Sequence, residues 1–206
     1  MGTRNLTMVI SNGETKVAQY GQWDGYPDGQ GKTVVNFIKK NSVKKFKEVL
    51  EKVKWINKRK QKEIDDFFKS IGCADGWMNM DQSELYHEKY PLLTRDNCAQ
   101  ILQMIMDSKD KTIWLHDSSD FAADSLFCEW AYVLDLDKRV LEVYRGFNRI
   151  PVDENSRFRN LNSETEEYQP IDLLTTYKFS ELKRMTIEEF VNKTEKLAYP
   201  EEEINK

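Results

Sequence analysis

The chain has 206 residues, of which 39% are hydrophobic and 32% are charged, with a formal net charge of −4. This length, together with an aromatic content of 12%, is sufficient for one large domain, or for a core with a small appendage, and argues against a disordered chain. No apolar run approaches the roughly 20 residues that a membrane-spanning helix needs, so we expect no membrane association.

The first predicted element is a β-hairpin. Residues 6–10 alternate and are rich in β-forming side chains, and the pair Asn12-Gly13 is the strongest short signal for a tight hairpin turn. Residues 15–20 form the returning strand. A short helix should follow, capped by Thr33 and carrying the apolar residues of 34–38.

Longer helical patterns come next. Ser42 is a good N-cap for a helix whose apolar residues recur at a spacing of three to four through 46–56. A second helical segment covers 64–71. Residues 72–91 have no clear period, and we predict an irregular crossover there.

The second half of the chain adds strands between helices. The predicted elements are a helix capped by Thr94, a short strand at 111–116, a hairpin formed by 127–134 and 140–144, a loop at 150–169, an edge strand at 177–182 and a last helix opened by a capping box at Thr186. Hairpins separated by helices, rather than strict βαβ alternation, predict a single α+β domain over 1–199 with a mainly antiparallel sheet covered by helices. Residues 200–206 should form a flexible acidic tail.

The candidate site is the segment 20–31, Tyr-Gly-Gln-Trp-Asp-Gly-Tyr-Pro-Asp-Gly-Gln-Gly. It contains four of the nine glycines, which allow close backbone approach, and aromatic rings that can stack on or enclose a ligand. The guanidinium of Arg4 would bind a carboxylate or phosphate. We therefore predict a non-catalytic site for a small anionic ligand or a partner protein. The predicted ligand-binding residues are Arg4, Asn5, Gln19, Gln22, Trp23, Asp24 and Tyr26.

Metal and cofactor motifs are weak or missing. Gly29–Thr33 nearly spells a phosphate-binding loop, but Tyr26 stands where that motif needs its first glycine. The acidic group 116–120, with Asp124, could hold a cation, but its spacing matches no EF-hand, and helix capping is the favoured interpretation. No zinc-type pairs of cysteine or histidine occur. We predict no metal and no cofactor.

Cysteine usage points to a reducing compartment. The three cysteines are odd in number and widely spaced, and Cys98 and Cys128 lie in apolar surroundings typical of small core residues. We therefore expect no disulfide framework and a cytoplasmic location.

At the start of the chain, Gly2-Thr3-Arg4-Asn5 leads into a strand whose hairpin partner ends at Gln22-Trp23-Asp24. This arrangement resembles the opening of N-terminal-nucleophile (Ntn) amidohydrolases of the bile-acid-hydrolase and penicillin-acylase type. The resemblance implies αββα layering and site roles for Arg4 and Asp24. Position 2 is glycine, which has no nucleophile, so it also implies an inactive relative. An active amidohydrolase would need a trimmed chain that begins at Thr3.

A second resemblance rests on three motifs. They are Gly-Thr-Arg-Asn-Leu-Thr at 2–7, Val-Ala-Gln-Tyr-Gly-Gln-Trp-Asp-Gly-Tyr-Pro-Asp-Gly-Gln-Gly at 17–31 and Cys-Glu-Trp-Ala-Tyr-Val-Leu-Asp-Leu-Asp at 128–137. As a set they look like a family of uncharacterised proteins of fungi, bacteria and phages. The resemblance implies that both halves belong to one fold, and the distribution of that family makes a phage or host-conflict role an expectation.

The remaining alternative is nucleic-acid binding through a Lys-rich helix at 39–63. That segment has eleven lysines and arginines against three glutamates, a net charge of +8, which leaves −12 for the rest of the chain. Clustered lysines bind phosphates through counterion release. A solvated face of an amphipathic helix explains the same pattern and is the favoured interpretation.

Overall fold

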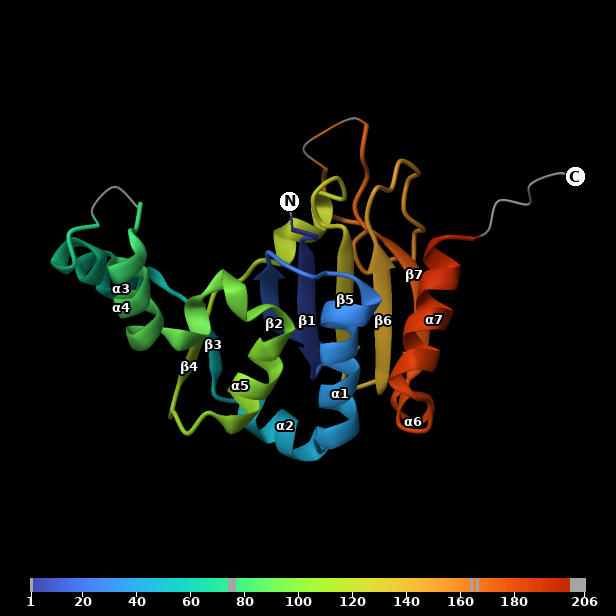
Figure 1. The fold of residues 1–206 in the computed structure, drawn as a ribbon, viewed down its shortest axis with the longest axis horizontal. Helices are drawn as coiled ribbons and strands as arrows, with labels where there is room; N and C mark the ends of the chain where they lie inside the picture. The colour runs from blue at the N-terminus through green and yellow to red at the C-terminus, as the bar shows by residue number, and fades with distance from the viewer. Residues whose placement is uncertain (1, 74–76, 164, 166, 201–206) are drawn as a thin grey trace, which may run out of the picture.

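The computed structural model describes residues 2–73, 77–163, 165 and 167–200. Its centre is a five-stranded sheet with the strand order β2-β1-β5-β6-β7 (Figure 1). The strands are β1 (Asn5–Ser11), β2 (Glu14–Gly21), β5 (Trp130–Asp135), β6 (Val140–Arg145) and β7 (Asp172–Lys178). Neighbouring strands are antiparallel except for β1 and β5, which run parallel. The predicted α+β fold with a mainly antiparallel sheet is confirmed.

The turn between β1 and β2 follows its local sequence. Asn12 and Gly13 have φ values of 56° and 75°, the two positive angles that a type I′ hairpin turn requires. Asp137, in the turn between β5 and β6, accepts hydrogen bonds from the backbone N–H groups of Asn12 and Gly13 at 3.1 and 2.9 Å. The two hairpins are therefore joined through one carboxylate.

Helices cover one face of the sheet (Figure 1). They are α1 (Lys32–Lys40), α2 (Val43–Leu50), α5 (Ile101–Asp107), α6 (Phe179–Leu182) and α7 (Ile187–Ala198). Strand side chains alternate between faces, so Val9 and Tyr132 join the core cluster on the helical side, whereas Met8 and Val133 point to the other side. The central strands are consequently buried on both faces.

Largely irregular segments, rather than a second layer of helices, cover the opposite face. Ala122, Cys128, Phe158 and Ile171 from these segments pack against the sheet there. An ion network fixes this cover, because Arg157 donates to Asp135 at 3.0 Å and to Glu142 at 2.9 Å. Both carboxylates are nearly inaccessible to solvent.

A smaller unit lies beside the β2 edge (Figure 1). It contains a parallel pair, β3 (Val53–Trp55) and β4 (Ile113–Leu115), and the helices α3 (Lys58–Ser70) and α4 (Met80–Lys89). Ile64, Tyr86 and Tyr90 form a separate core cluster between these helices. A bridge between Ala18 of β2 and Asp117, just beyond β4, joins the unit to the main sheet.

The predicted long helix through 46–56, and with it the Lys-rich helix 39–63, is wrong. The chain instead passes through the end of α1, then α2, β3 and the start of α3. Ser42 and Asn57 each accept a hydrogen bond from a backbone N–H three residues later, so that each begins a new helix. Between these helices, residues 53–55 pair with β4, a partner about 60 residues away in sequence that no local period reveals.

The predicted irregular crossover at 72–91 is also wrong in its second half, where α4 forms. Asn79 and Gln82 make a complete capping box at its start. This pair was visible in the sequence, whereas the apolar periodicity of the helix was weak. Residues 74–76 of the predicted crossover lie outside the described residues.

Three other boundaries differ from their predictions. The edge strand begins at Asp172 and ends at Lys178, and the predicted continuation to 182 is the helix α6. Thr33 does not cap α1, because its hydroxyl donates to the carbonyl of Gly29 at 3.2 Å. Thr94 caps as predicted, but it opens a 3₁₀ turn (Arg95–Gln100) before α5. The predicted capping box at Thr186 is present.

Two predictions about architecture receive no support from the structure. The αββα layering implied by the Ntn resemblance has no support, because the second sheet of the described residues has two short strands and lies at the edge of the first. The predicted acidic tail falls, apart from Pro200, outside the described residues. No helix in the described part of the chain combines the length and the apolar character that crossing a bilayer demands.

Candidate functional site

The predicted site lies at one end of the main sheet. Strand pairing places Gly21, Asn5, Trp130, Arg145 and Asp172 in one row across the five strands. The segment 22–31 leaves β2 at this row and crosses to the start of α1 on the helical side (Figure 1). It includes a short π-helical turn (Pro27–Gly31).

The glycines of this segment serve internal packing. The backbone N–H of Gly25 donates to the carbonyl of Thr3 at 2.9 Å, and the Gly25 carbonyl accepts from the hydroxyl of Tyr132 at 2.8 Å. A Cβ atom on Gly29 would lie 2.2 Å from the carbonyl oxygen of Asp24, and one on Gly31 would lie 2.9 Å from the Tyr132 hydroxyl. Close approach is therefore required, as the glycines suggested, but the approaching groups belong to the protein itself.

Three of the predicted ligand-binding residues use their side chains within the fold. The Asn5 amide is fully buried and donates to the carbonyl of Trp23 at 3.1 Å, while its Oδ1 has no partner among the described residues. Gln19 donates to the Thr94 carbonyl at 3.2 Å, and Gln22 accepts from the Tyr20 hydroxyl at 2.6 Å. These residues shape the segment from inside.

The other four predicted residues face solvent to different degrees. Trp23 and Tyr26 are 48% and 43% exposed, and Asp24 is exposed with φ at 54°. Arg4 is half-buried, with its guanidinium 4.7 Å from the centre of the Phe127 ring. No ion pair joins Arg4 to Asp24 within the described residues.

Trp23 is held in place despite its exposure. Its Nε1 donates to the Asp96 carboxylate at 3.2 Å, and its ring lies against the backbone of Gly2, where a Cβ atom would approach ring carbon Cε3 to 2.3 Å. Thr3, the nucleophile that a trimmed amidohydrolase would use, is buried beside this ring with its carbonyl bonded to Gly25.

Cys98 lies beneath the same segment in an uncommon backbone conformation. Its φ and ψ are 44° and −135°, and its sulfur approaches the Trp23 carbonyl at 3.8 Å. Burial raises the pKa of this thiol, and burial likewise raises the pKa of Cys128 far above its ordinary value. Both cysteines are core residues, as predicted, because their side chains are buried, and the raised pKa disfavours the nucleophilic thiolate.

The sequence analysis missed a second arginine at this end. The Arg145 guanidinium lies 4.7 Å from the Trp130 ring centre, 5.2 Å from that of Phe147 and 5.3 Å from that of Tyr199. It donates to the Glu129 carbonyl and to the Tyr199 hydroxyl. The three rings come from separate segments, so that no local motif could have revealed the cluster.

Five exposed aromatic residues and two half-buried arginines thus lie at the same end of the sheet, and we call this set the aromatic–arginine surface. It consists of Arg4, Trp23, Tyr26, Phe127, Arg145, Phe147 and Tyr199. Five of the six exposed aromatic side chains of the described residues belong to it, Trp77 being the sixth. Neither arginine has a carboxylate partner within the described chain.

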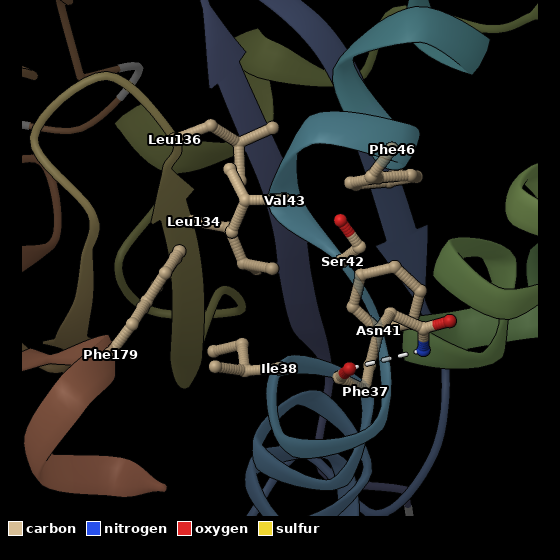
Figure 2. A pocket seen from close by; sticks show the side chains of 9 residues that line it. All are labelled: Phe37, Ile38, Asn41, Ser42, Val43, Phe46, Leu134, Leu136 and Phe179. Atoms are coloured by element: carbon tan, nitrogen blue, oxygen red, sulfur yellow. Dashed lines mark hydrogen bonds between the residues drawn. The ribbon is translucent and has the colours of Figure 1, made fainter.

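Other hollows of the molecule lie elsewhere. A cavity of about 10 Å³ between α1, α2, α6 and the end of β5 is lined mostly by apolar side chains (Figure 2). In it, Asn41 already donates to the Phe37 carbonyl. This volume is about that of one water molecule, so the cavity is a packing gap.

No metal centre forms from the acidic group near residue 120. The described residues contain no cluster of three or more potential metal-binding side chains. Asp117 instead accepts from the backbone N–H of Ser119 at 3.0 Å, and Asp124 accepts from that of Phe127 at 3.3 Å. These two acids order the backbone of turns, whereas the predicted helix capping is not seen at Ser118, which precedes the 3₁₀ turn Ser119–Ala123 without a side-chain capping bond.

Comparisons with protein-family models, with curated proteins and with solved structures returned no match to this chain.

Proposed function

We propose that this protein binds a partner protein through the aromatic–arginine surface. The observation that carries the proposal is the gathering of five exposed aromatic side chains at one end of the sheet. Aromatic residues and arginine are enriched at protein interfaces, where they dominate the binding free energy. Clusters of exposed apolar side chains at one place on a surface mark interaction sites.

The form of the surface favours a protein over a small molecule. Its rings are about half exposed and project from several segments, whereas a small ligand is usually enclosed in a concave site. Several rings are already held in place, Trp23 by Asp96 and Gly2, and Tyr199 by Arg145. Side chains that are ordered beforehand lose less conformational entropy on binding, and affinity rises accordingly.

The two arginines of the surface indicate which chemical groups the partner protein presents. Arg4 and Arg145 each rest on aromatic rings and keep donor groups that no carboxylate of the described chain occupies. A guanidinium binds a carboxylate through two parallel hydrogen bonds. We therefore infer that the partner places acidic side chains over these two arginines and apolar groups over the rings.

A photo-crosslinking experiment tests the proposal. Benzoylphenylalanine replaces Phe147, and in a second protein Phe127, and each protein is irradiated in an extract of its native cells. We expect a discrete polypeptide adduct from both positions. Replacing Leu85 of α4, which is 47% exposed, provides the control and should give no such adduct.

Two further variants examine the same surface. Trp23→Ala and Arg4→Glu should each abolish the adduct, with a loss of unfolding free energy of only about 1 kcal/mol because both side chains are partly exposed. Identical adducts from Phe147 and Leu85 would contradict the proposal. So would adducts that survive in both variants.

A further inference from the structure

A second surface lies on the smaller unit, beside the strand β4 and the helix α3. Two adjoining grooves of about 320 and 370 Å³ share Lys60, Glu63 and Trp114 in their linings. The Lys60 ammonium and the Glu63 carboxylate pair at 2.7 Å between them. The two grooves are therefore parts of one open channel, and the Lys60–Glu63 ion pair lies at their boundary.

Trp114 provides an aromatic platform in this channel. Its neighbours in β4, Ile113 and Leu115, are buried, so the half-buried Trp114 points to the opposite face of the strand. Lys54 of β3 is its register partner in the parallel pair and therefore lies beside it on the same face. An indole ring next to an ammonium group offers stacking and charge together.

Further cations line the channel from the helices. Arg59 of α3 lines one groove and Lys89 of α4 lines the other. Within the described residues, no carboxylate forms an ion pair with Arg59, Lys89 or Lys54. Two carboxylates line the channel. Glu63 is paired with Lys60, whereas Asp110 forms no ion pair within the described residues. The channel therefore has unbalanced positive charge.

We propose that this channel binds single-stranded nucleic acid. An open groove that combines unpaired cations with a stacking ring is the common design of proteins that bind single strands without sequence specificity. The cations would contact phosphates, and Trp114 would stack on a base. The site differs from the predicted Lys-rich helix, because α1, α2 and their lysines do not line the channel, and segment 39–63 contributes through β3 and the start of α3.

Fluorescence anisotropy with labelled single-stranded oligonucleotides of about 12 nucleotides, as DNA and as RNA, tests the proposal at low salt. We expect Arg59→Glu to weaken binding by about tenfold and to lower the salt dependence of the affinity. Lys45→Glu on α2 makes the same charge change at an exposed lysine outside the channel. This control should change the affinity less than about twofold.

Trp114→Leu should weaken binding by about tenfold through the loss of stacking, whereas Trp23→Leu, at the other surface, should have no effect. The proposal fails if the wild-type protein does not bind at low salt, or if Arg59→Glu and Lys45→Glu weaken binding equally. It also fails if a free mononucleotide or a polyglutamate peptide competes as well as the oligonucleotide, because that result indicates a simple anion site. If the Trp114→Leu variant does not fold, the comparison of Arg59→Glu with Lys45→Glu still tests the proposal.

Discussion

At the scale of single residues, Gly31 shows how the loop after β2 depends on its glycines. A Cβ atom there would lie 2.9 Å from the Tyr132 hydroxyl, which donates to the Gly25 carbonyl. Gly31→Ala should lower the free energy of unfolding by about 1–3 kcal/mol, measured by urea denaturation. In a Tyr132→Leu background the cost of Gly31→Ala should be smaller, since the hydroxyl and the ring carbons Cε1 and Cζ, at 2.9, 3.0 and 3.1 Å, are all gone. Equal costs in both backgrounds would show that the Tyr132 ring is not the obstacle.

Asp137 gives a prediction about pH. Its hydrogen bond from Lys47, followed by those from Gly13 and Asn12, lowers the pKa of this carboxyl from 3.8 to about 2. Because the folded-state pKa is the lower one, the carboxylate stabilises the fold fully above about pH 4 and loses this effect as the pH falls toward 2. Asp137→Asn should therefore be less stable than wild type at pH 7, and the difference should vanish near pH 2.

Thermal unfolding of both proteins between pH 2 and 7 measures this difference. In a Lys47→Met background the effect of Asp137→Asn should shrink, because the largest cause of the lowered pKa is removed. A difference in stability between the wild-type protein and the Asp137→Asn variant that does not depend on pH would refute the role of the charge.

At the scale of elements, Arg157 decides whether the cover of the non-helical face stays in place. It pairs with Asp135 and Glu142, whose side chains are only 4% and 11% exposed, while the exposed Lys138 lies 3.8 Å from Asp135. Arg157→Met leaves Glu142 buried without a cation and Asp135 with only the exposed Lys138, and should cost about 3 kcal/mol in chemical denaturation. Adding Glu142→Gln should restore part of the loss. A cost below about 1 kcal/mol would mean that solvent reaches the carboxylates.

Elements whose signals are local were predictable from the sequence. The Asn12-Gly13 turn and the capping box at Thr186 formed as expected, because each depends on contacts within a few residues. The break of the predicted helix after Leu50 was not predictable, since residues 53–55 find their partner in β4. Helical periodicity was present there, and a distant pairing overrode it.

At the scale of the whole molecule, the two proposed surfaces lie at separate places. The aromatic–arginine surface lies at the ends of the strands of the main sheet, whereas the channel around Trp114 lies within the smaller unit. The first depends on Arg4 and Arg145, and the second on Arg59 and Lys89. A variant at one surface can therefore be used as a control for the other.

The sequence by itself determined the class of the fold and drew attention to Arg4, Trp23 and Tyr26. Local propensities and glycine spacing are properties of neighbouring residues, and they remain readable without coordinates. Only the tertiary structure brought Phe127, Arg145, Phe147 and Tyr199 to the same end, and only it showed that Asn5 is buried. The physical reason is that strand pairing and helix packing join residues far apart in the chain, and burial follows from those contacts.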